Sequence, residues 1–443
     1  MKTVEPRKPG GFGEYLPNEQ IEFNRLLDII RHTYERYGFA PLDTPDLELT
    51  EVLLAKGGGE TEQEVYSFAR EGSRTNLTMR YDLTVPLARY VAEHESDLVF
   101  PFRRYHIGKV HRAERQQAGR FREFYQCDID VIGSDSPIVD AEFPAVINEI
   151  FEAFNFGEFV IHLNNRQVLN GFFESIGLVD SARDVLHVID KMAKITHDEL
   201  LASLKKVGLT DEQVKKVLAF TSISGTSDEV FAQIAALSVD SEQFNAGVEK
   251  LKTIVLAIKA MGVPEHRFMI DLKIARGLDY YTGTVYETFL SDYPQIGSVC
   301  SGGRYDDLAS YYTKTRLPGV GISIGLTRLF YALRQAGAIN ATQQSPAHTI
   351  VVPIDTPQSE YAIQVADSLR GAGVETVLYS EPDDMGKKLR YASRMGFRHA
   401  VIIGEAEQSA GTVSLKDLAA RQDQQVTPDE AVRILSADKK DTN

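Results

Sequence analysis

Hydrophobic and polar positions change their period several times along the chain, and each change predicts a different kind of element. Apolar residues recur at helical spacing from 18 to 37, where Gly38 is a suitable helix stop. Between 77 and 160, short β-rich runs alternate with turns and one helix near 140–154. From about 166 to 255, Lys, Glu, Leu and Ala dominate, which predicts successive helices. Strands are expected again within 268–290 and at 298–301.

A further change comes after residue 335. Residues 336–348 are small and polar and contain Pro346, which is typical of a linker. Beyond them, strands predicted at 349–354, 374–379 and 400–403 are separated by helices, a pattern typical of a doubly wound α/β fold. We therefore predict an α/β protein with four parts: an α+β domain with a mainly antiparallel sheet at 1–166 and 256–335, a helical insertion at 167–255, a linker at 336–348, and a doubly wound domain at 349–443.

Composition narrows the class of protein. A chain of 443 residues is too long for one hydrophobic core. The net charge of −15 argues against a general nucleic-acid coat protein, which would carry a broad basic surface. It does not exclude a protein that binds nucleic acid at local basic patches. The two cysteines, Cys127 and Cys300, form no zinc motif, and no stretch approaches a membrane span. We expect a cytoplasmic protein that does not enter a membrane.

The segment at 101–126 places Arg, Lys and His between aromatic residues and predicts a strand, a loop and a strand with Gly119 near the turn. Arginine pairs well with phosphate oxygens because its planar fork donates two parallel hydrogen bonds. Arg112 and Arg120 are therefore candidates to contact separate phosphates. Glu114 is a candidate to accept from an exocyclic amine, and Phe124 to stack on a base. The alternative is a solvated basic hairpin with an aromatic inner face.

Several segments in a fixed order carry a family resemblance. Segment 101–126 resembles motif 2 of the class II aminoacyl-tRNA synthetases. Arg-Gly-Leu-Asp-Tyr-Tyr at 276–281 and Ser-Gly-Gly-Arg-Tyr-Asp at 301–306 resemble the two histidine-specific signatures of the histidyl-tRNA synthetase family. The segments at 319–329, 18–45 and 81–86 are similar to motif 3, motif 1 and the amino-acid-binding segment. The resemblance covers essentially the whole chain and implies a histidine–tRNA ligase that is a homodimer through motif 1.

The resemblance implies that ATP and histidine form histidyl-adenylate and pyrophosphate before histidine passes to the 3′ end of its tRNA. Arg112 and Arg276 are the implied catalytic residues, holding the α-phosphate from two sides. Arg328, assisted by Arg120, is implied to hold the γ-phosphate. Glu114 and Phe124 of the 101–126 hairpin are implied to recognise adenine. Mg²⁺ is expected to bridge phosphate oxygens, and no protein residue is assigned as a metal ligand.

The resemblance also implies a histidine pocket. The ammonium group is assigned to Asp82 and Thr84, and the backbone end of histidine to Gln126. The two imidazole nitrogens are assigned to Asp130 and to one of two adjacent tyrosines. The full set of implied histidine-binding residues is Asp82, Leu83, Thr84, Gln126, Asp130, Arg276, Tyr280 and Tyr281. Alternatives stay open, because Asp82 also suits a helix N-cap and the tyrosines also suit a core.

The expected tRNA contacts lie elsewhere. Basic residues follow helical spacing in the predicted anticodon-binding domain, and a solvated helix face is the alternative explanation. The loop of the 101–126 hairpin offers two further candidates near the acceptor end. The basic cluster is Lys387, Lys388, Arg390, Arg394 and Arg398, of which 387, 390, 394 and 398 have the helical spacing that predicts one stripe, and the loop candidates are Gln116 and Gln117.

Two competing functions remain for such a chain. A synthetase-like regulatory subunit of a phosphoribosyltransferase would sense histidine without ligating it, and an accessory protein would only bind nucleic acid. The retained arginines Arg112, Arg276 and Arg328 and the C-terminal α/β region favour the ligase. One position departs from the family pattern, because Thr327 stands where motif 3 usually carries an acid.

Overall fold

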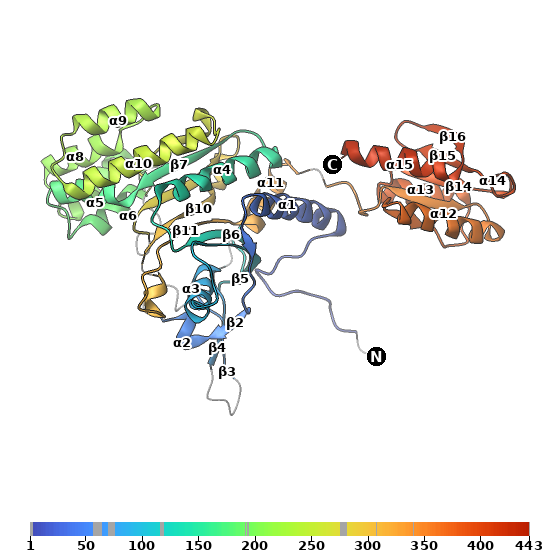
Figure 1. Cartoon of the computed structure of the whole chain (residues 1–443), viewed down its shortest axis with the longest axis horizontal. Coiled ribbons are helices and arrows are strands. Elements are labelled where there is room, and N and C mark those ends of the chain that lie inside the picture. The colour runs from blue at the N-terminus through green and yellow to red at the C-terminus, as the bar shows by residue number, and fades with distance from the viewer. Residues whose placement is uncertain are drawn as a thin grey trace. The chain divides into compact units, whose positions relative to one another are not determined.

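The computed structural model describes residues 3–55, 64–69, 76–115, 119–190, 192, 195–274, 281–306, 308–339 and 341–442. The chain divides into two compact units, one formed by 1–13 and 27–339 and the other by 14–26 and 340–443 (Figure 1). Within the described ranges, no helix has the length and apolar character needed to cross a membrane.

The larger unit is built around a sheet of eight described strands. Their order is β1-β5-β6-β11-β10-β9-β7-β8. The pairs β1–β5 and β7–β8 are parallel, whereas the other pairs are antiparallel, which confirms the predicted sheet type. The strands are β1 (Ala40–Pro41), β5 (Phe102–His111), β6 (Glu123–Ile132), β7 (Phe159–Asn165), β8 (Phe268–Ile270), β9 (Thr284–Leu290), β10 (Ser298–Tyr305) and β11 (Gly319–Ile324).

The two faces of β6 have different partners because side chains alternate along a strand. Cys127, Ile129 and Val131 are fully buried with the apolar core. Helix α1 (Pro17–Arg36) is tied to this strand by the Tyr34 hydroxyl, which donates to the backbone oxygen of Cys127 at 2.9 Å. The alternate residues of β6, on its opposite face, are polar, so that face of the sheet is available for a binding site.

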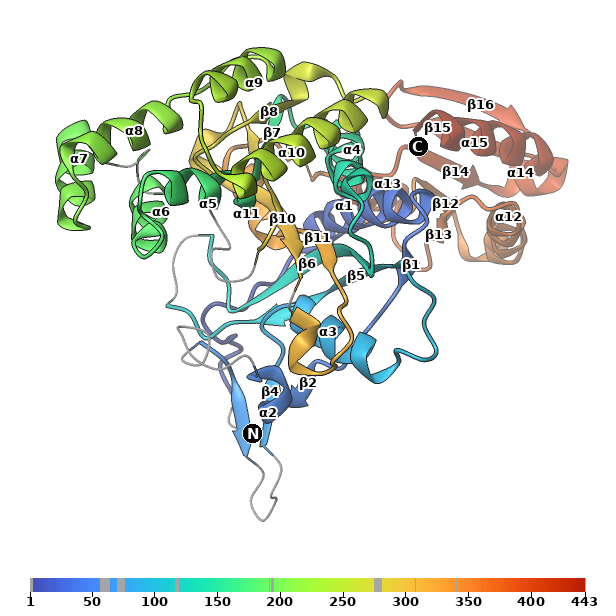
Figure 2. The same cartoon turned by 60° about the vertical axis from the view of Figure 1, so that its left-hand side comes forward.

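The helices predicted from about 166 to 255 are present, and they gather on one side of the larger unit (Figure 2). Three of them begin with capping boxes at Thr196, Thr210 and Thr226, in which each threonine accepts from the backbone while a Glu or Gln reaches back. Helix α10 packs against α5 and α4. These helices are α5 (Arg166–Ser175), α6 (Ala182–Asp190), α7 (His197–Lys206), α8 (Asp211–Thr221), α9 (Ser227–Ala236) and α10 (Glu242–Ala260).

Smaller elements of the same unit frame the site. A three-stranded sheet has the order β2-β4-β3, and α3 follows it along the chain. Helix α11 directly follows β11, which brings motif 3 to the sheet. The elements are β2 (Leu47–Leu49), α2 (Thr50–Leu53), β3 (Ser67–Ala69), β4 (Asn76–Met79), α3 (Thr84–Glu93), α4 (Pro137–Phe154) and α11 (Leu326–Gln335).

The second unit contains a five-stranded sheet with the order β13-β12-β14-β15-β16 among its described residues. The first three strands are parallel, as expected, and the sheet has buried apolar clusters that include Ile350 in one and Val351 in the other. The antiparallel hairpin β15–β16 was not predicted. The elements are β12 (Thr349–Pro353), α12 (Ser359–Gly371), β13 (Thr376–Leu378), α13 (Met385–Met395), β14 (His399–Ile403), α14 (Glu405–Ala410), β15 (Val413–Asp417), β16 (Gln422–Val426) and α15 (Pro428–Thr442).

Candidate functional site

Two adjoining cavities lie against the polar face of the large sheet. The larger encloses about 300 Å³ and the smaller about 190 Å³. Arg112, Gln126, Ser301 and Ser323 line both. A ligand in one cavity therefore meets a ligand in the other at a boundary that includes a guanidinium group.

The larger cavity brings together the residues predicted to bind a nucleotide. Arg112, Glu114, Arg120, Phe124 and Arg328 all line it. Glu114 accepts from Arg120 at 2.9 Å and lies 3.9 Å from Arg112. The Arg112 guanidinium lies 5.1 Å from the centre of the Phe124 ring. Three arginines beside one acid make this cavity suited to a polyanion.

The hairpin that supplies these residues has the predicted form. Strands β5 and β6 pair antiparallel from Phe102↔Ile132 to His111↔Glu123. Beyond the pairing, the Arg112 backbone N–H donates to the Arg122 oxygen at 2.9 Å, and the Arg112 Nε donates to the Tyr81 oxygen at 3.0 Å. These bonds hold Arg112 between the hairpin and the segment that precedes α3.

Helix α11 supplies the third arginine. The Arg328 Nη2 donates to the Ile296 oxygen at 2.9 Å, and the side chain still lines the larger cavity. Thr327 is buried, and its hydroxyl accepts from the Tyr125 backbone N–H at 2.9 Å. The residue that departs from the family pattern therefore joins the start of α11 to β6.

The smaller cavity has the opposite electrostatic character, because it is lined by Asp82, Asp128 and Asp130. Asp130 faces Arg104 across the β5–β6 ladder, and their side chains lie 2.6 Å apart. The Tyr305 hydroxyl donates to the other Asp130 oxygen at 2.6 Å. Burial raises the pKa of Asp130, whereas Arg104 and Tyr305 act to lower it. Asp130 is thus a buried carboxylate fixed by two neighbours.

Asp82 hydrogen-bonds the first turn of α3 and also lies at the smaller cavity. Its Oδ1 accepts from the Val85 backbone N–H at 3.0 Å, one residue before the Leu83 N-cap position, and it lines the cavity together with Thr84. Burial is the main cause that raises its pKa. Leu83 is buried and contributes its backbone oxygen, which accepts from Arg104 at 3.1 Å.

Asp128, Tyr305 and Ser323 line this pocket and Arg104 pairs with Asp130 behind it, and these four residues were not predicted as site residues. Asp128 is signalled by the sequence, because 126, 128 and 130 share one face of a strand and the first and last were already candidates. The other three needed the register, which places Arg104 opposite Asp130 and Ser323 opposite Asp128.

Glycine allows the sheet to pass close to these carboxylates. A Cβ on Gly321 would lie 2.0 Å from the Asp130 Oδ1, and a Cβ on Gly303 would lie 2.9 Å from the Tyr281 ring. Gly325 has nothing within 4 Å of its Cβ position, so no close approach requires glycine there. Tyr281 lines the smaller cavity, and burial raises its pKa, which keeps its hydroxyl protonated.

Some predicted residues lie outside the described residues. These are Arg276 and Tyr280, with Gln116 and Gln117 of the hairpin loop. Among the residues that the structure does describe, no group of three or more His, Cys, Asp or Glu is placed to hold a metal ion.

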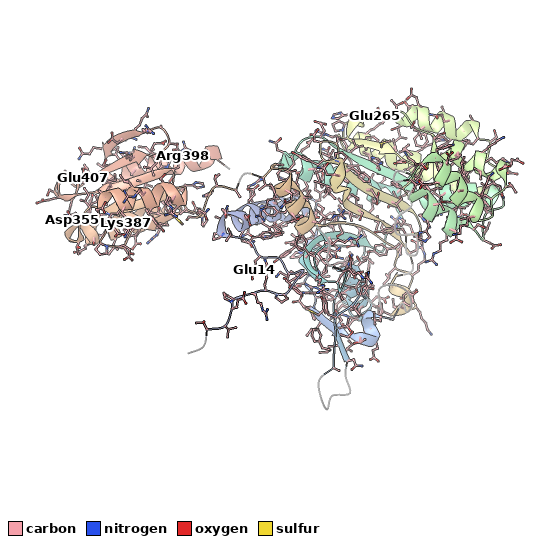
Figure 3. All side chains as sticks on the ribbon, turned by 180° about the vertical axis from the view of Figure 1, so that it is seen from behind. Glu14, Glu265, Asp355, Lys387, Arg398 and Glu407 are labelled. Carbon is pink, nitrogen blue, oxygen red and sulfur yellow. The ribbon has the colours of Figure 1, made fainter. Side chains whose placement is uncertain are left out.

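In the predicted basic cluster, Lys388 is the member that lies outside the stripe at 387, 390, 394 and 398. It is buried, and its Nζ donates to the Pro353 and Ile354 backbone oxygens at 2.7 and 3.1 Å, so it is not part of an exposed basic surface. Lys387 pairs with Asp383 at 2.6 Å, and Arg398 lies 3.6 Å from Asp438. Figure 3 labels Lys387 and Arg398, which lie in the first turn of α13 and beyond its end.

Two family models match the chain. One described as "Histidyl-tRNA synthetase" matches residues 11–329, and one described as "Anticodon binding domain" matches residues 348–438. The first spans both cavities, and the second spans nearly all of the five-stranded sheet and its helices.

Curated relatives and solved structures agree with the family models. Histidine–tRNA ligase of Clostridium tetani is 50% identical over 435 residues, covering 98% of each chain. That of Stenotrophomonas maltophilia is 47% identical over 456 residues, again covering 98% of each. The crystal structure of histidyl-tRNA synthetase from Nostoc sp. PCC 7120 matches with a TM-score of 0.92 and 42% identity, covering 97% of this chain and 99% of that one. A structure titled as a regulatory subunit of ATP phosphoribosyltransferase or histidyl-tRNA synthetase, from Bacillus halodurans, shares the fold at 20% identity and a TM-score of 0.74, covering 91% of this chain and 99% of that one.

Proposed function

The chain belongs to the histidyl-tRNA synthetase family, and on this premise we propose how its residues ligate histidine to tRNA. ATP occupies the cavity lined by Arg112, Arg120 and Arg328, and histidine occupies the carboxylate-lined cavity beside it. The observation that carries this assignment is the shared boundary at Arg112. The reacting atoms, the carboxylate of histidine and the α-phosphorus of ATP, belong at that boundary.

The first step joins two negatively charged groups. The histidine carboxylate attacks the α-phosphorus, a C–O–P linkage forms, and the bond to the β-phosphate oxygen breaks to release pyrophosphate. Arg112 is placed to neutralise charge on the α-phosphate, while Arg120 and Arg328 hold the outer phosphates. Holding both reactants in adjoining cavities also removes the entropic cost of bringing them together. In the second step, a ribose hydroxyl at the 3′ end of the tRNA attacks the carbonyl carbon, and AMP leaves.

Several roles rest on the family rather than on described contacts. Arg276 holds the α-phosphate opposite Arg112, and Tyr280 or Tyr281 reads one imidazole nitrogen while Asp130 reads the other. Mg²⁺ would accompany ATP and offset charge on its phosphates, and Glu114 is the described carboxylate of the larger cavity that could approach it. The enzyme works as a cytoplasmic homodimer. Its helical insertion at 167–255 contacts the acceptor arm, and its C-terminal α/β domain reads the anticodon.

The test of this function is histidine-dependent exchange of labelled pyrophosphate into ATP by the purified full chain. Exchange that requires histidine and stops in the Arg276→Ala variant, with an unchanged melting temperature, supports the assignment. A folded sample without exchange refutes it. The competing regulatory subunit would bind histidine without exchange, and the 47–50% identical relatives, which are named histidine–tRNA ligases, do not favour it.

A further inference from the structure

One residue of a central strand faces open space at the point where the two cavities meet. Strand β10 lies between β11 and β9 in the large sheet. Of its eight residues, all of which the structure describes, Ser301 alone is exposed. Ser301 also lines both cavities, so the space above its side chain is the space in which their ligands meet. Its hydroxyl is therefore accessible to a ligand in either cavity.

The Ser301 hydroxyl makes no hydrogen bond to the part of the chain that the structure describes. The other three residues that line both cavities already have partners. The Gln126 Nε2 donates to the Ser323 hydroxyl at 2.8 Å, and Ser323 also forms a hydrogen bond with Asp128. The Arg112 Nε donates to a backbone oxygen at 3.0 Å. Ser301 thus supplies an uncommitted hydroxyl beside one guanidinium group.

The backbone that carries this hydroxyl is fixed on both sides. Ser301 pairs with Ser323 on β11 and with Glu287 on β9. The next residue packs closely, because a Cβ on Gly302 would lie 2.1 Å from the Gly321 backbone oxygen. A serine hydroxyl is placed by one side-chain torsion, so a fixed backbone leaves it few positions. A donor held in this way needs little reorganisation when charge develops near it.

The group expected at this boundary consists of hydrogen-bond acceptors. In the proposed function, the histidine carboxylate attacks the α-phosphorus here, and an acyl–phosphate junction forms. The carbonyl oxygen and the free phosphate oxygens of this junction accept hydrogen bonds and cannot donate them. Negative charge on these oxygens changes during both steps of the reaction. A fixed donor therefore stabilises the transition states more than it stabilises the bound reactants.

Resting on the proposed function, we propose that the Ser301 hydroxyl donates a hydrogen bond to the acyl–phosphate junction and is a further catalytic residue of the ligase. It acts beside Arg112, which provides the positive charge that a hydroxyl lacks. The serine keeps its proton throughout, so the bonds that form and break are those of the two steps already given. Its exposure distinguishes it from the four buried residues that follow it in β10.

The experiment compares the full-length enzyme with its Ser301→Ala variant and uses three probes. Histidyl-sulfamoyl adenosine is a stable mimic of histidyl-adenylate that contains the junction, whereas histidinol lacks the carboxyl group and adenosine lacks the phosphate. The Kd of the mimic should rise about 3- to 10-fold in the variant, and kcat for pyrophosphate exchange should fall by a similar factor, as expected for a lost neutral hydrogen bond. The Ki values of histidinol and adenosine should stay within about twofold.

A matched control is Ser414→Ala on β15, which removes a half-buried strand hydroxyl that also lacks a partner within the described ranges and lines neither cavity. It should leave all constants unchanged. The melting temperature of Ser301→Ala should equal that of the unsubstituted enzyme, because the hydroxyl holds nothing in the fold. If the alanine variant does not fold, Ser301→Cys gives the same comparison, since a thiol is a weak donor.

Two results would overturn the inference. An unchanged Kd of the mimic would show that the hydroxyl does not contact the junction. A Ki for adenosine or for histidinol that rises as much as the Kd of the mimic would assign Ser301 to the ribose or to the histidine pocket instead. In either case, normal exchange by the unsubstituted enzyme would leave the proposed function standing.

Discussion

The two cavities differ in how their charged side chains are held, although they share a wall. In the larger cavity, Arg120 is 57% exposed and meets Glu114 at its side. At the smaller one, Asp128 and Asp130 are nearly fully buried, and Arg104, which pairs with Asp130, is fully buried. The first keeps its cations accessible to a polyanion. The second has carboxylates fixed within the fold before any ligand binds. The arginine cavity is therefore expected to tolerate substitution at a cost in activity, and the carboxylate cavity at a cost in stability as well.

Arg112 gives the largest expected effect because it lines both cavities. Arg112→Ala should lower histidine-dependent exchange by about 10²- to 10³-fold, the size seen when a preorganised transition-state donor is removed. The melting temperature should change little, since the side chain is 34% exposed. Arg316→Ala is a matched control, because that exposed arginine pairs with Asp135 outside both cavities. Normal exchange by the Arg112→Ala enzyme would remove the shared boundary as the place of reaction.

Asp130 sharpens the comparison through stability. Asp130→Asn leaves the buried Arg104 charge without its carboxylate, which should lower the free energy of unfolding by about 3 kcal/mol in urea titrations. Arg120→Ala should change the same quantity by less than about 0.5 kcal/mol, since its ion pair is exposed. Equal losses in the two variants would show that the cavities do not differ as described.

The histidine KM gives a second measurement on Asp130→Asn. It should rise, because the amide no longer offers a charged acceptor to the imidazole N–H. The increase should also appear in the Ki for 3-(imidazol-4-yl)propionate, which keeps the ring and the carboxylate of histidine but lacks its ammonium group.

Asp128 predicts a pH dependence of intermediate size. Burial raises its pKa from 3.8 to about 7, so folding favours the protonated form. Its stabilising contribution is complete below about pH 4 and is lost as the pH rises to about 7. The free energy of unfolding of Asp128→Asn, relative to the unsubstituted protein, should therefore increase over this range and level off above it. A difference that is flat from about pH 4 to about pH 8 would contradict the raised pKa.

Several titratable or charged groups act on Asp128 besides Ser323, and they belong to five parts of the fold. The variant comparison cancels their own titration to first order, because each remains in both proteins. They are Cys127 and Asp130 on β6, Arg104 on β5, Cys300 on β10, Tyr34 on α1, and Asp82 and Tyr281 on connecting segments; His106 is the cross-strand neighbour on β5. Burial and the nearby Arg104 and Arg80 lower the pKa of His106 to about 3, so it stays neutral over the tested range.

Thr327 gives the smallest expected effect. Thr327→Val removes the hydroxyl that accepts from the Tyr125 N–H, which should lower the free energy of unfolding by about 1 kcal/mol. Exchange should remain within a few-fold of normal, with any loss appearing in the KM for ATP through Arg328. A large fall in kcat alone would mean that Thr327 acts on the reaction rather than on the helix.

The sequence predicted what depends on local pattern and family motif. The helical spacing of α1, the β5–β6 hairpin and the residues of the larger cavity follow from contiguous segments. The hairpin β15–β16 was missed because Gln422–Val426 is mostly exposed and polar, so it carries no alternating apolar signal. Lys388 was grouped with the basic cluster, although it lies off the helical stripe, because the sequence does not reveal that its Nζ reaches backbone oxygens inside the domain.

The smaller cavity shows which features of the site could not be predicted from the sequence. Asp130 was predicted, but its partners Arg104 and Tyr305 come from β5 and β10 and needed the sheet register. Asp128 was overlooked although it lies between two predicted residues on one strand face. Its significance comes from the partner that its Oδ1 lacks among the described residues, which is a property of three-dimensional packing.

The most direct test of the account is a crystal structure of the enzyme with ATP and histidinol, in which no reaction can occur because the carboxylate is missing. The account predicts the triphosphate beside Arg112, Arg120 and Arg328, and the histidinol imidazole within about 3.2 Å of an Asp130 side-chain oxygen in the carboxylate-lined cavity. Phosphates bound away from these arginines, or a histidinol ring outside the carboxylate-lined cavity, would contradict it.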